Sequence, residues 1–322
     1  MNPVLALIIT NFIWGAASPI FKLSLQNIPP FTLAFIRFFF AGLLFTYFAL
    51  LHWQKITWRQ FFMICFGAFF AVTVNIGFYF LALPKTASIN APIIASSQPI
   101  FLFFLSIFFL KEKPNKKVFR GILISFIGVL VIILSPLFTN GTVSAAAKEA
   151  ALEGNLYLVI ATFGSVLNAI IFKRVLKQVN FYQVTFISFL FGAFTFFPLM
   201  HGEVQRWSFA MIDYRGWMGI IFGVVFSSAI AYGCFNYGVS KIDAQEVGIF
   251  SYIDPVIAIL LAIPLVHEYP TLSFYIGTFF VFVGILLAEG RIHWHPIHRL
   301  RNVKSQMANV PTSPKGFDVR GK

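Results

Sequence analysis

The chain has 322 residues, of which 58% are hydrophobic and only 11% are charged, and its formal net charge is +13. Soluble proteins carry about 25% charged residues, so most of this chain must be dissolved in lipid rather than in water. The composition therefore excludes a soluble enzyme or binding domain and predicts an all-α integral membrane protein.

A transmembrane helix needs about 20 mostly apolar residues, and ten segments of the chain satisfy this condition. In chain order, the ten predicted helices occupy residues 3–22, 31–51, 61–83, 88–110, 117–137, 154–173, 182–200, 216–239, 244–266 and 272–290. Most connections between them are short. Beyond the last helix, a polar and basic tail is predicted to be disordered.

The basic residues predict how the helices are oriented. Cytoplasmic connections of membrane proteins are enriched in Lys and Arg. A cytoplasmic N-terminus would place 18 of the 24 basic residues on the cytoplasmic side. We therefore expect a multi-pass protein of the inner (plasma) membrane with both termini in the cytoplasm. The net charge is then a signal of topology, and it predicts no nucleic-acid partner.

The chain contains an internal repeat. Residues 66–134 align without a gap with residues 222–290, and 15 of these 69 positions are identical. Chance would give roughly 5 identities at this composition. Because each half has an odd number of helices, the second half must enter the membrane upside down. The fold class predicted is ten transmembrane helices arranged as two inverted-topology five-helix repeats, an architecture of secondary transporters.

Several motifs resemble a known family. The first helix contains WGAASPIFKLSL, the second begins with PPFTLAFIRFFFAG, and the fourth and ninth end in KEKP and HEYP. In this order and spacing they resemble EamA-type members of the drug/metabolite transporter superfamily. The resemblance implies a ten-helix fold with cytoplasmic ends. It also implies a central cavity lined by helices 1, 3, 4, 6, 8 and 9, and export of small metabolites.

The repeat and the resemblance together predict the domain organisation. Residues 1–137 and 154–290 each form one EamA-like five-helix repeat, residues 138–153 form an external connecting loop, and residues 291–322 form the cytoplasmic tail. The connecting loop is rich in Ala, Thr and Gly and is expected to act as a hinge between the halves.

Two charged or polar positions stand beside prolines inside apolar helices. Asp254 lies about ten residues into the ninth helix and precedes Pro255, while Gln98 and Pro99 occupy the equivalent positions of the fourth. Proline removes a backbone donor and opens a helix, and matched breaks of this kind indicate a midplane binding site. Asp254 is predicted to contact a cationic substrate group or to bind a proton. A purely structural role, such as neutralising Arg37, stays open.

Arg37 lies about seven residues into the second helix. A guanidinium group can bind a substrate carboxylate in a bidentate manner, but a structural ion pair or an interface anchor would also explain it. Other polar or aromatic side chains of the apolar helices are candidate cavity walls: Trp14, Asn75, Asn168, Asn236, Tyr237 and Tyr252, with Tyr232 beside them. Such residues more often form interhelical hydrogen bonds or pack against neighbouring helices, so a structural role stays open for each of them.

Other motifs favour structural roles. Glu112 and Glu268, which precede the prolines of KEKP and HEYP, are expected to accept from backbone donors where the next helix begins. The tail motif RIHWHPIH indicates a basic anchor at the membrane surface rather than a metal site. The sequence has no Walker, HExxH, GxSxG or CxxC motif. No metal, cofactor or catalytic residue is predicted, and the chain is not expected to be an enzyme.

The function predicted is a secondary transporter that exports a small organic metabolite, an amino acid or a drug-like solute, by alternating access. The expected partners are this solute, the lipid bilayer and a coupling proton or ion, with Asp254 as the candidate proton site. Two alternatives remain. A nucleotide-sugar or organophosphate carrier would need several basic residues in its cavity, whereas only Arg37 is available. A membrane-embedded protein without transport, such as a lipid-modifying enzyme or a sensor, would have a closed centre or a catalytic cluster.

Overall fold

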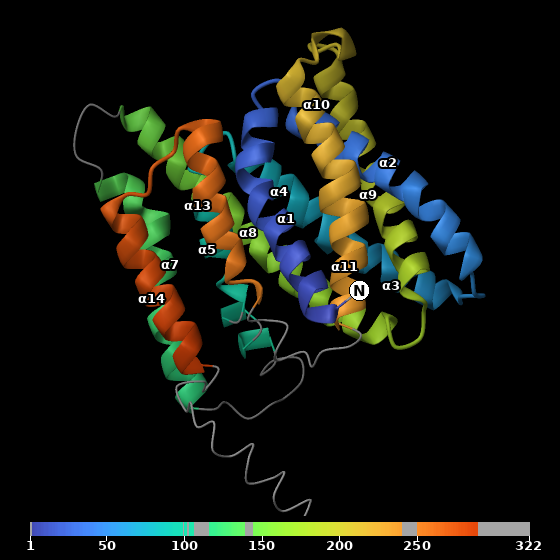
Figure 1. Cartoon of the computed structure of the whole chain (residues 1–322), viewed down its shortest axis with the longest axis horizontal. Coiled ribbons are helices and arrows are strands. Elements are labelled where there is room, and N and C mark those ends of the chain that lie inside the picture. The colour runs from blue at the N-terminus through green and yellow to red at the C-terminus, as the bar shows by residue number, and fades with distance from the viewer. Residues whose placement is uncertain are drawn as a thin grey trace, which may run out of the picture.

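The computed structural model describes residues 2–98, 100–101, 103–105, 116–138, 144–239 and 250–288. Within these ranges all regular secondary structure is helical (Figure 1). The elements are α1 (Pro3–Ser24), α2 (Pro30–Leu51), α3 (Trp58–Ala68), η1 (Phe69–Val74), α4 (Asn75–Ala82), α5 (Asn90–Ala95), α7 (Lys116–Leu134), η2 (Ser135–Phe138), α8 (Ala145–Val175), α9 (Phe181–Val204), η3 (Phe209–Met211), α10 (Tyr214–Ile221), η4 (Phe222–Ile230), α11 (Ala231–Val239), α13 (Ile253–Val266) and α14 (Leu272–Ala288).

Several helices begin at polar residues that satisfy the free backbone donors of the first turn. The side chains of Asn2, Asn180 and Asp213 accept from backbone N–H groups at the starts of α1, α9 and α10. Thr57 and Gln60 form a reciprocal capping box at α3. Because each cap replaces a bond that lipid cannot supply, these residues define where the apolar helices begin.

Seven helical stretches of the described chain are long and apolar enough to cross a membrane. They coincide with seven of the ten segments predicted from the sequence. Residues 253–266 and 272–287 form further apolar helices that are shorter. The predicted fourth helix, 88–110, lies only partly within the described residues. The chain is therefore a multi-pass, all-helical membrane protein.

The fourth and ninth predicted helices are interrupted rather than continuous. Ser96 and Ser97 form a turn after α5, and Ser251 and Tyr252 form a turn before α13. The N–H of Asp254 donates to the carbonyl of Ser251 at 3.2 Å, a three-residue span that tightens the backbone. A proline is tolerated in the first turn of a helix, where its missing donor is not needed. Asp254 therefore lies in the first turn of α13, and the expected position about ten residues into one helix is wrong.

The predicted connecting loop 138–153 is partly helical. α8 begins at Ala145, nine residues earlier than its apolar segment indicated. The Ser144 side chain accepts from the N–H of Ala147 at 3.2 Å, and the run AAAKEAALEG that follows consists almost entirely of strong helix formers. The apolar pattern misses this nine-residue stretch of helix because its residues are helix-forming without being strongly apolar.

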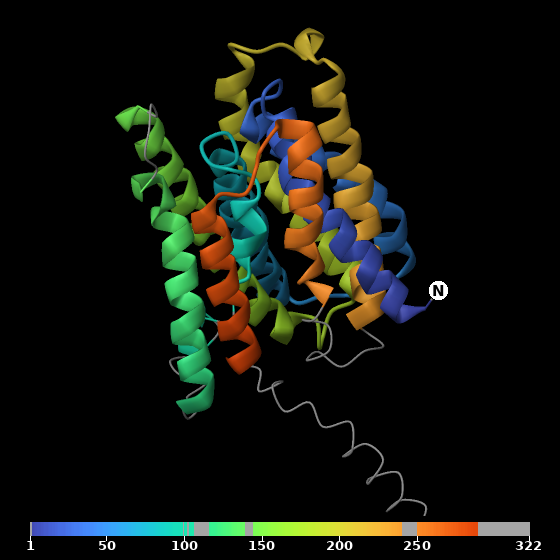
Figure 2. The same cartoon turned by 60° about the vertical axis from the view of Figure 1, so that its left-hand side comes forward.

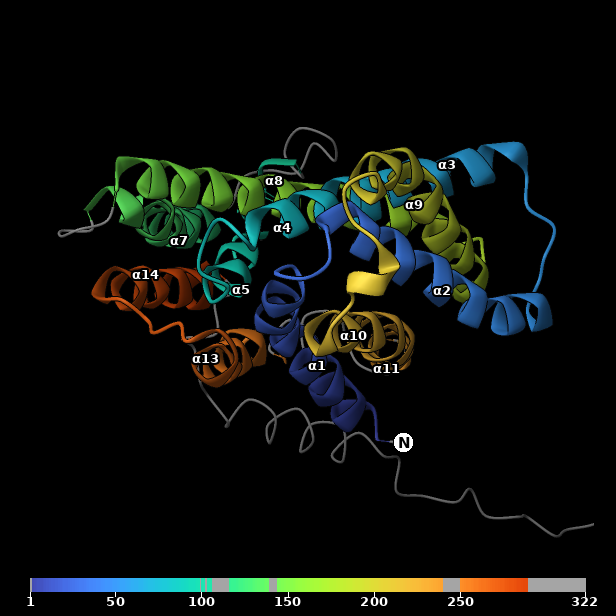
Figure 3. The ribbon, with the colours of Figure 1, turned by 90° about the horizontal axis from the view of Figure 1, so that it is seen from above.

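Two helix pairs, α7 with α14 and α2 with α9, lie toward opposite sides of the bundle (Figures 1 and 3), and Figure 2 shows α7 and α14 side by side. α7 and α14 approach closely at glycines. A Cβ on Gly128 would lie 2.5 Å from the carbonyl oxygen of Gly277, and a Cβ on Gly284 would lie 2.5 Å from that of Gly121. In the internal repeat Gly121 corresponds to Gly277 and Gly128 to Gly284. Each contact is thus the image of the other.

The third and eighth predicted helices contain π-helical segments. η1 covers Phe69–Val74 and η4 covers Phe222–Ile230. Moved by the repeat offset of 156 residues, η1 falls within η4. π-helical turns are rare and occur often at functional sites. Both segments border the polar centre of the bundle, since Asn75 directly follows η1 and Ser227 lies within η4.

Candidate functional site

A cavity of about 270 Å³ lies at the centre of the described helices. Side chains from α1, α2, α4, α5, α8, η4, α11 and α13 line it. Six residues singled out in the sequence are among them: Trp14, Arg37, Asn75, Gln98, Tyr232 and Asp254. Residues up to 240 positions apart in the chain thus meet around one space.

Arg37 is held in the cavity wall by neutral groups. Its side chain is buried, with 3% of the residue exposed. Nε donates to Oγ of Ser228 at 3.1 Å and Nη2 donates to Oγ of Ser227 at 3.0 Å. The guanidinium lies over the rings of Phe21 and Phe38, at 5.1 and 4.9 Å from their centroids. Among the described residues no carboxylate lies within 4.0 Å of it.

Asp254 brings a carboxylate to the same cavity. It occupies the first turn of α13, where the helix dipole favours a negative charge. Its Oδ1 is buried and has no hydrogen-bond partner within the described part of the chain. The close approach of α1 depends on Gly15, because a Cβ there would lie 2.8 Å from the carbonyl oxygen of Asp254. α1 and the start of α13 therefore form one rigid side of the cavity.

Three other predicted residues tie neighbouring helices together around the cavity. Asn75 donates from Nδ2 to the carbonyl of Ala161 at 2.7 Å. Trp14 donates from Nε1 to the carbonyl of Ser227 at 3.3 Å. Gln98 donates from Nε2 to Oγ of Ser165 at 3.3 Å. Each of these side chains therefore donates one hydrogen bond to a neighbouring helix, and the rest of the side chain lines the cavity.

Comparison with known proteins identifies the family. A sequence profile of the EamA-like transporter family matches residues 1–134 and 152–289. The chain belongs to this family. Its two matched stretches contain all the residues that line the cavity.

Individual relatives of this EamA-like protein are also transporters by name. An uncharacterized transporter YetK of Bacillus subtilis (strain 168) is 26% identical over 291 residues, covering 89% of this chain and 86% of the relative. An uncharacterized transporter of Archaeoglobus fulgidus is 28% identical over 284 residues, covering 88% and 96%. A crystal structure with a TM-score of 0.61 and 18% identity covers 90% of this chain and 98% of its own. This structural likeness supports the fold alone. The family match shows that the chain is a membrane transporter.

The remaining predicted site residues lie away from the lining of the cavity. Asn168 is on α8, and its buried Oδ1 has no hydrogen-bond partner among the described residues. Tyr252 packs edge-on against the ring of Phe282 at 5.4 Å, and Tyr237 is exposed on α11. Pro255 is buried in α13. Pro99, Glu112, the tail motif RIHWHPIH and the side chain of Asn236 lie outside the described residues and side chains.

The EamA-like cavity also contains residues that the sequence interpretation missed. Ser18 and Tyr79 line it, and the hydroxyls of Ser227 and Ser228 hold Arg37. The pair Ser227–Ser228 inside the apolar run VVFSSAIAY was a usable signal, since adjacent hydroxyls in lipid need partners. Tyr79 carried no distinguishing signal in a chain whose residues are 18% aromatic.

Glu268 contacts a different helix from the one expected. Its Oε2 accepts from the N–H of Ser88 at 2.7 Å and from the Ser88 hydroxyl at 2.6 Å. Its Oε1 forms an ion pair with Lys22 of α1. The start of α14 is capped instead by the Thr271 hydroxyl, which accepts from the N–H of Phe274 at 3.2 Å. Glu268 thus joins α1, the start of α5 and the end of α13 at one end of the bundle.

Proposed function

We propose that this EamA-like protein is a secondary transporter that exports a small zwitterionic metabolite, such as an amino acid, by alternating access. The observation that carries the proposal is the pairing of charges in one cavity. Arg37 and Asp254 line the same space, and no ion pair between them or with another described residue neutralises either. A charge in the hydrocarbon region costs about 2.5–3.5 kcal/mol on insertion scales. A structural role without an ion-pair partner does not offset this cost.

The two charges define the substrate's chemistry. The planar guanidinium of Arg37 is suited to bind a carboxylate in a bidentate manner. The carboxylate of Asp254 is suited to bind an ammonium group. The rings of Trp14 and Phe21 line the same cavity and would contact the solute's apolar part. A solute with both charges would satisfy both side chains at once, whereas an amine or an acid would satisfy only one.

The size of the cavity favours a small solute. Pockets that hold drug-sized ligands measure about 300–1,000 Å³, and this cavity of about 270 Å³ lies just below that range. A nucleotide sugar or an organophosphate is larger and would need several cations, whereas Arg37 is the one Lys or Arg among the residues that line the described cavity. Because the family and its named relatives are transporters, a lipid-modifying enzyme or a sensor is also disfavoured.

The alternating-access part of the proposal rests on the internal repeat. We infer ten transmembrane helices in two inverted repeats, residues 1–137 and 154–290, with both termini on the cytoplasmic side of the inner (plasma) membrane. The reciprocal glycine contacts of α7 and α14 and the equivalent positions of η1 and η4 support a two-fold relation between the halves. Halves related in this way can exchange conformations by rocking about a central site. Asp254 is the proposed site of a coupling proton.

Counterflow in proteoliposomes tests the proposal. Vesicles preloaded with a pool of unlabelled amino acids should accumulate labelled amino acid when they carry the wild-type chain. Asp254→Asn should lower this uptake by at least tenfold. Asp213→Asn, which removes a carboxylate at the start of α10 outside the cavity lining, should leave it unchanged. Equal uptake by the wild type and Asp254→Asn, with both variants folded, would remove Asp254 from binding and coupling.

A further inference from the structure

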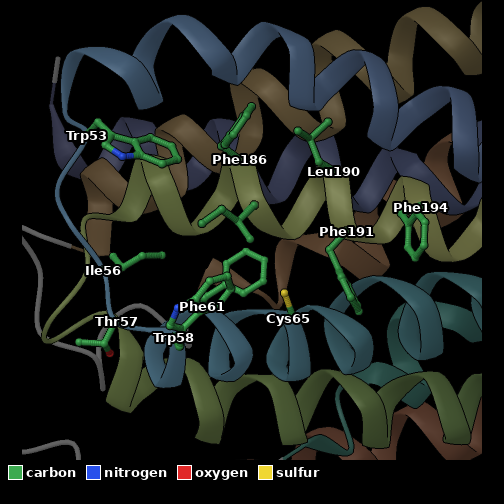
Figure 4. Close-up of a pocket in the computed structure, with 11 residues that line it drawn as sticks. Trp53, Ile56, Thr57, Trp58, Phe61, Cys65, Phe186, Leu190, Phe191 and Phe194 are labelled. Atoms are coloured by element: carbon green, nitrogen blue, oxygen red, sulfur yellow. The ribbon is translucent and has the colours of Figure 1, made fainter.

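A second hollow lies between α3 and α9, and we name it the α3–α9 groove (Figure 4). Its volume is about 690 Å³. Phe61 and Cys65 of α3 face Phe186, Leu190, Phe191 and Phe194 of α9 across it. It shares no lining residue with the central cavity. An apolar wall of this kind offers nothing to a hydrated solute and is suited to a hydrocarbon chain.

The groove continues along the outer surface of α3. An adjoining hollow of about 840 Å³ is also lined by Phe61, Cys65, Phe191 and Phe194. Arg59, in the first turn of α3, completes its lining at one end. A nearly continuous apolar surface thus leads to a single cation.

One end of the groove carries the residues typical of a membrane surface. Trp53 and Trp58 lie there and are 50% and 77% exposed, respectively (Figure 4). Tryptophan is enriched where lipid head groups meet the hydrocarbon region. Lys55 and Arg59 are exposed in the same stretch, and neither forms an ion pair with any described residue. Two cations without an ion-pair partner in the described part of the chain therefore lie at the head-group end of an apolar groove.

The length of the groove corresponds to one leaflet. Phe186 and Phe194 are eight residues apart on α9, which corresponds to about 12 Å at 1.5 Å per residue. Half of a hydrocarbon core that is about 30 Å thick is about 15 Å. An acyl chain that starts at the level of the tryptophans would lie along the whole groove.

We propose that the α3–α9 groove binds an anionic phospholipid. One acyl chain lies between α3 and α9, and the phosphate group lies beside Lys55 and Arg59. This site does not depend on the proposed transport of a metabolite, because it shares no residue with the central cavity. It would fix one lipid beside two helices of opposite halves of the chain.

Quenching by brominated lipid tests the proposal. The full chain is reconstituted in phosphatidylcholine vesicles with rising fractions of dibrominated phosphatidylglycerol or, in a second series, dibrominated phosphatidylcholine. Bromine quenches indole fluorescence only at contact distance. The part of the quenching that is lost in Trp53→Phe/Trp58→Phe comes from lipid in contact with the tryptophans at the groove. Because both cations near the head groups attract anionic lipid, this signal should half-saturate at a phosphatidylglycerol fraction about tenfold or more below that of phosphatidylcholine.

Matched charge variants identify the source of the preference. Lys55→Gln/Arg59→Gln should bring the two half-saturation points together. Arg174→Gln/Lys177→Gln removes one Arg from the last turn of α8 and one Lys from the turn that follows it, outside the groove lining, and should leave the tenfold difference in place. Unchanged thermal unfolding shows that both variants fold. Equal half-saturation in the wild type, an equal loss in both variants, or groove tryptophans that neither lipid quenches would overturn the proposal, the last result indicating a protein occupant.

Discussion

The central cavity and the α3–α9 groove are two hollows of one helical bundle that place their charges differently. In the cavity, Arg37 and Asp254 line the wall itself, and Arg37 has only 3% of its surface exposed. In the groove, the wall is apolar and the charges, Lys55 and Arg59, are exposed at one end. A buried charge needs a partner of opposite charge inside the hollow. An exposed charge at the end of a groove can have its partner at the membrane surface. The first arrangement suits a charged solute and the second suits a lipid.

Exchanging arginine for lysine in each hollow should separate these two roles most strongly. Arg37→Lys keeps the charge but loses the planar fork, so two aligned hydrogen bonds to a carboxylate become one. A hydrogen bond to a charged group contributes about 1.5–3 kcal/mol, so the apparent affinity in counterflow should fall about 10- to 100-fold. Arg59→Lys is the control. A point charge suffices for a phosphate, so transport and lipid preference should both persist.

A methyl group added at Gly15 should disturb the side of the cavity that α1 and α13 form. In Gly15→Ala, the new Cβ would lie within 3 Å of the Asp254 backbone. Overpacking of this kind costs about 1–3 kcal/mol, so thermal unfolding should shift downward and transport should fall. Gly233→Ala on α11 is the matched control, because no heavy atom of the described residues outside its own stretch of helix lies within 4 Å of its added Cβ. Equal effects of the two substitutions would show that Gly15 does not position Asp254.

The contact that joins α1 to α13 should have a smaller effect on stability. Glu268→Gln removes the ion pair with Lys22. The side chain of Glu268 is 14% exposed and that of Lys22 is 19% exposed. It also weakens the acceptor for Ser88. The free energy of unfolding should fall by about 1–2 kcal/mol. If the contact is specific, Lys22→Met/Glu268→Gln should be less destabilised than the sum of the single variants. Strict additivity would contradict a direct interaction.

The smallest expected effect is a pH dependence at the start of α10. Hydrogen bonds from Arg215 hold the pKa of the Asp213 carboxyl below its usual value of 3.8. Because the folded pKa is the lower one, this contribution to stability is complete above pH 4 or so and disappears as the pH falls through the folded pKa. Asp213→Asn keeps a good N-cap and should lose the dependence. Thermal unfolding between about pH 5 and pH 3 measures it, and identical profiles of the two proteins would contradict it.

The sequence predicts the apolar helices and the charged residues better than the contacts between them. Arg37 and Asp254 are conspicuous because charges are rare in apolar runs. The partners of Arg37 lie 190 and 191 residues away in the chain, and no local pattern predicts such a contact. For the same reason the sequence predicts the wrong helix start for Glu268, since its partner Ser88 is 180 residues away. The early start of α8 is not predicted because an Ala-rich helix is less apolar than a membrane-spanning segment.

The most direct test of the paired charges is a counterflow comparison of three solutes on three proteins. The solutes are an amino acid, the amine that lacks its carboxylate and the acid that lacks its ammonium group. The proteins are the wild type, Arg37→Lys and Asp254→Asn. Arg37→Lys should lower uptake only of solutes with a carboxylate, and Asp254→Asn should lower uptake only of solutes with an ammonium group. Equal losses for all three solutes in both variants would contradict a site in which Arg37 and Asp254 bind opposite ends of one zwitterion.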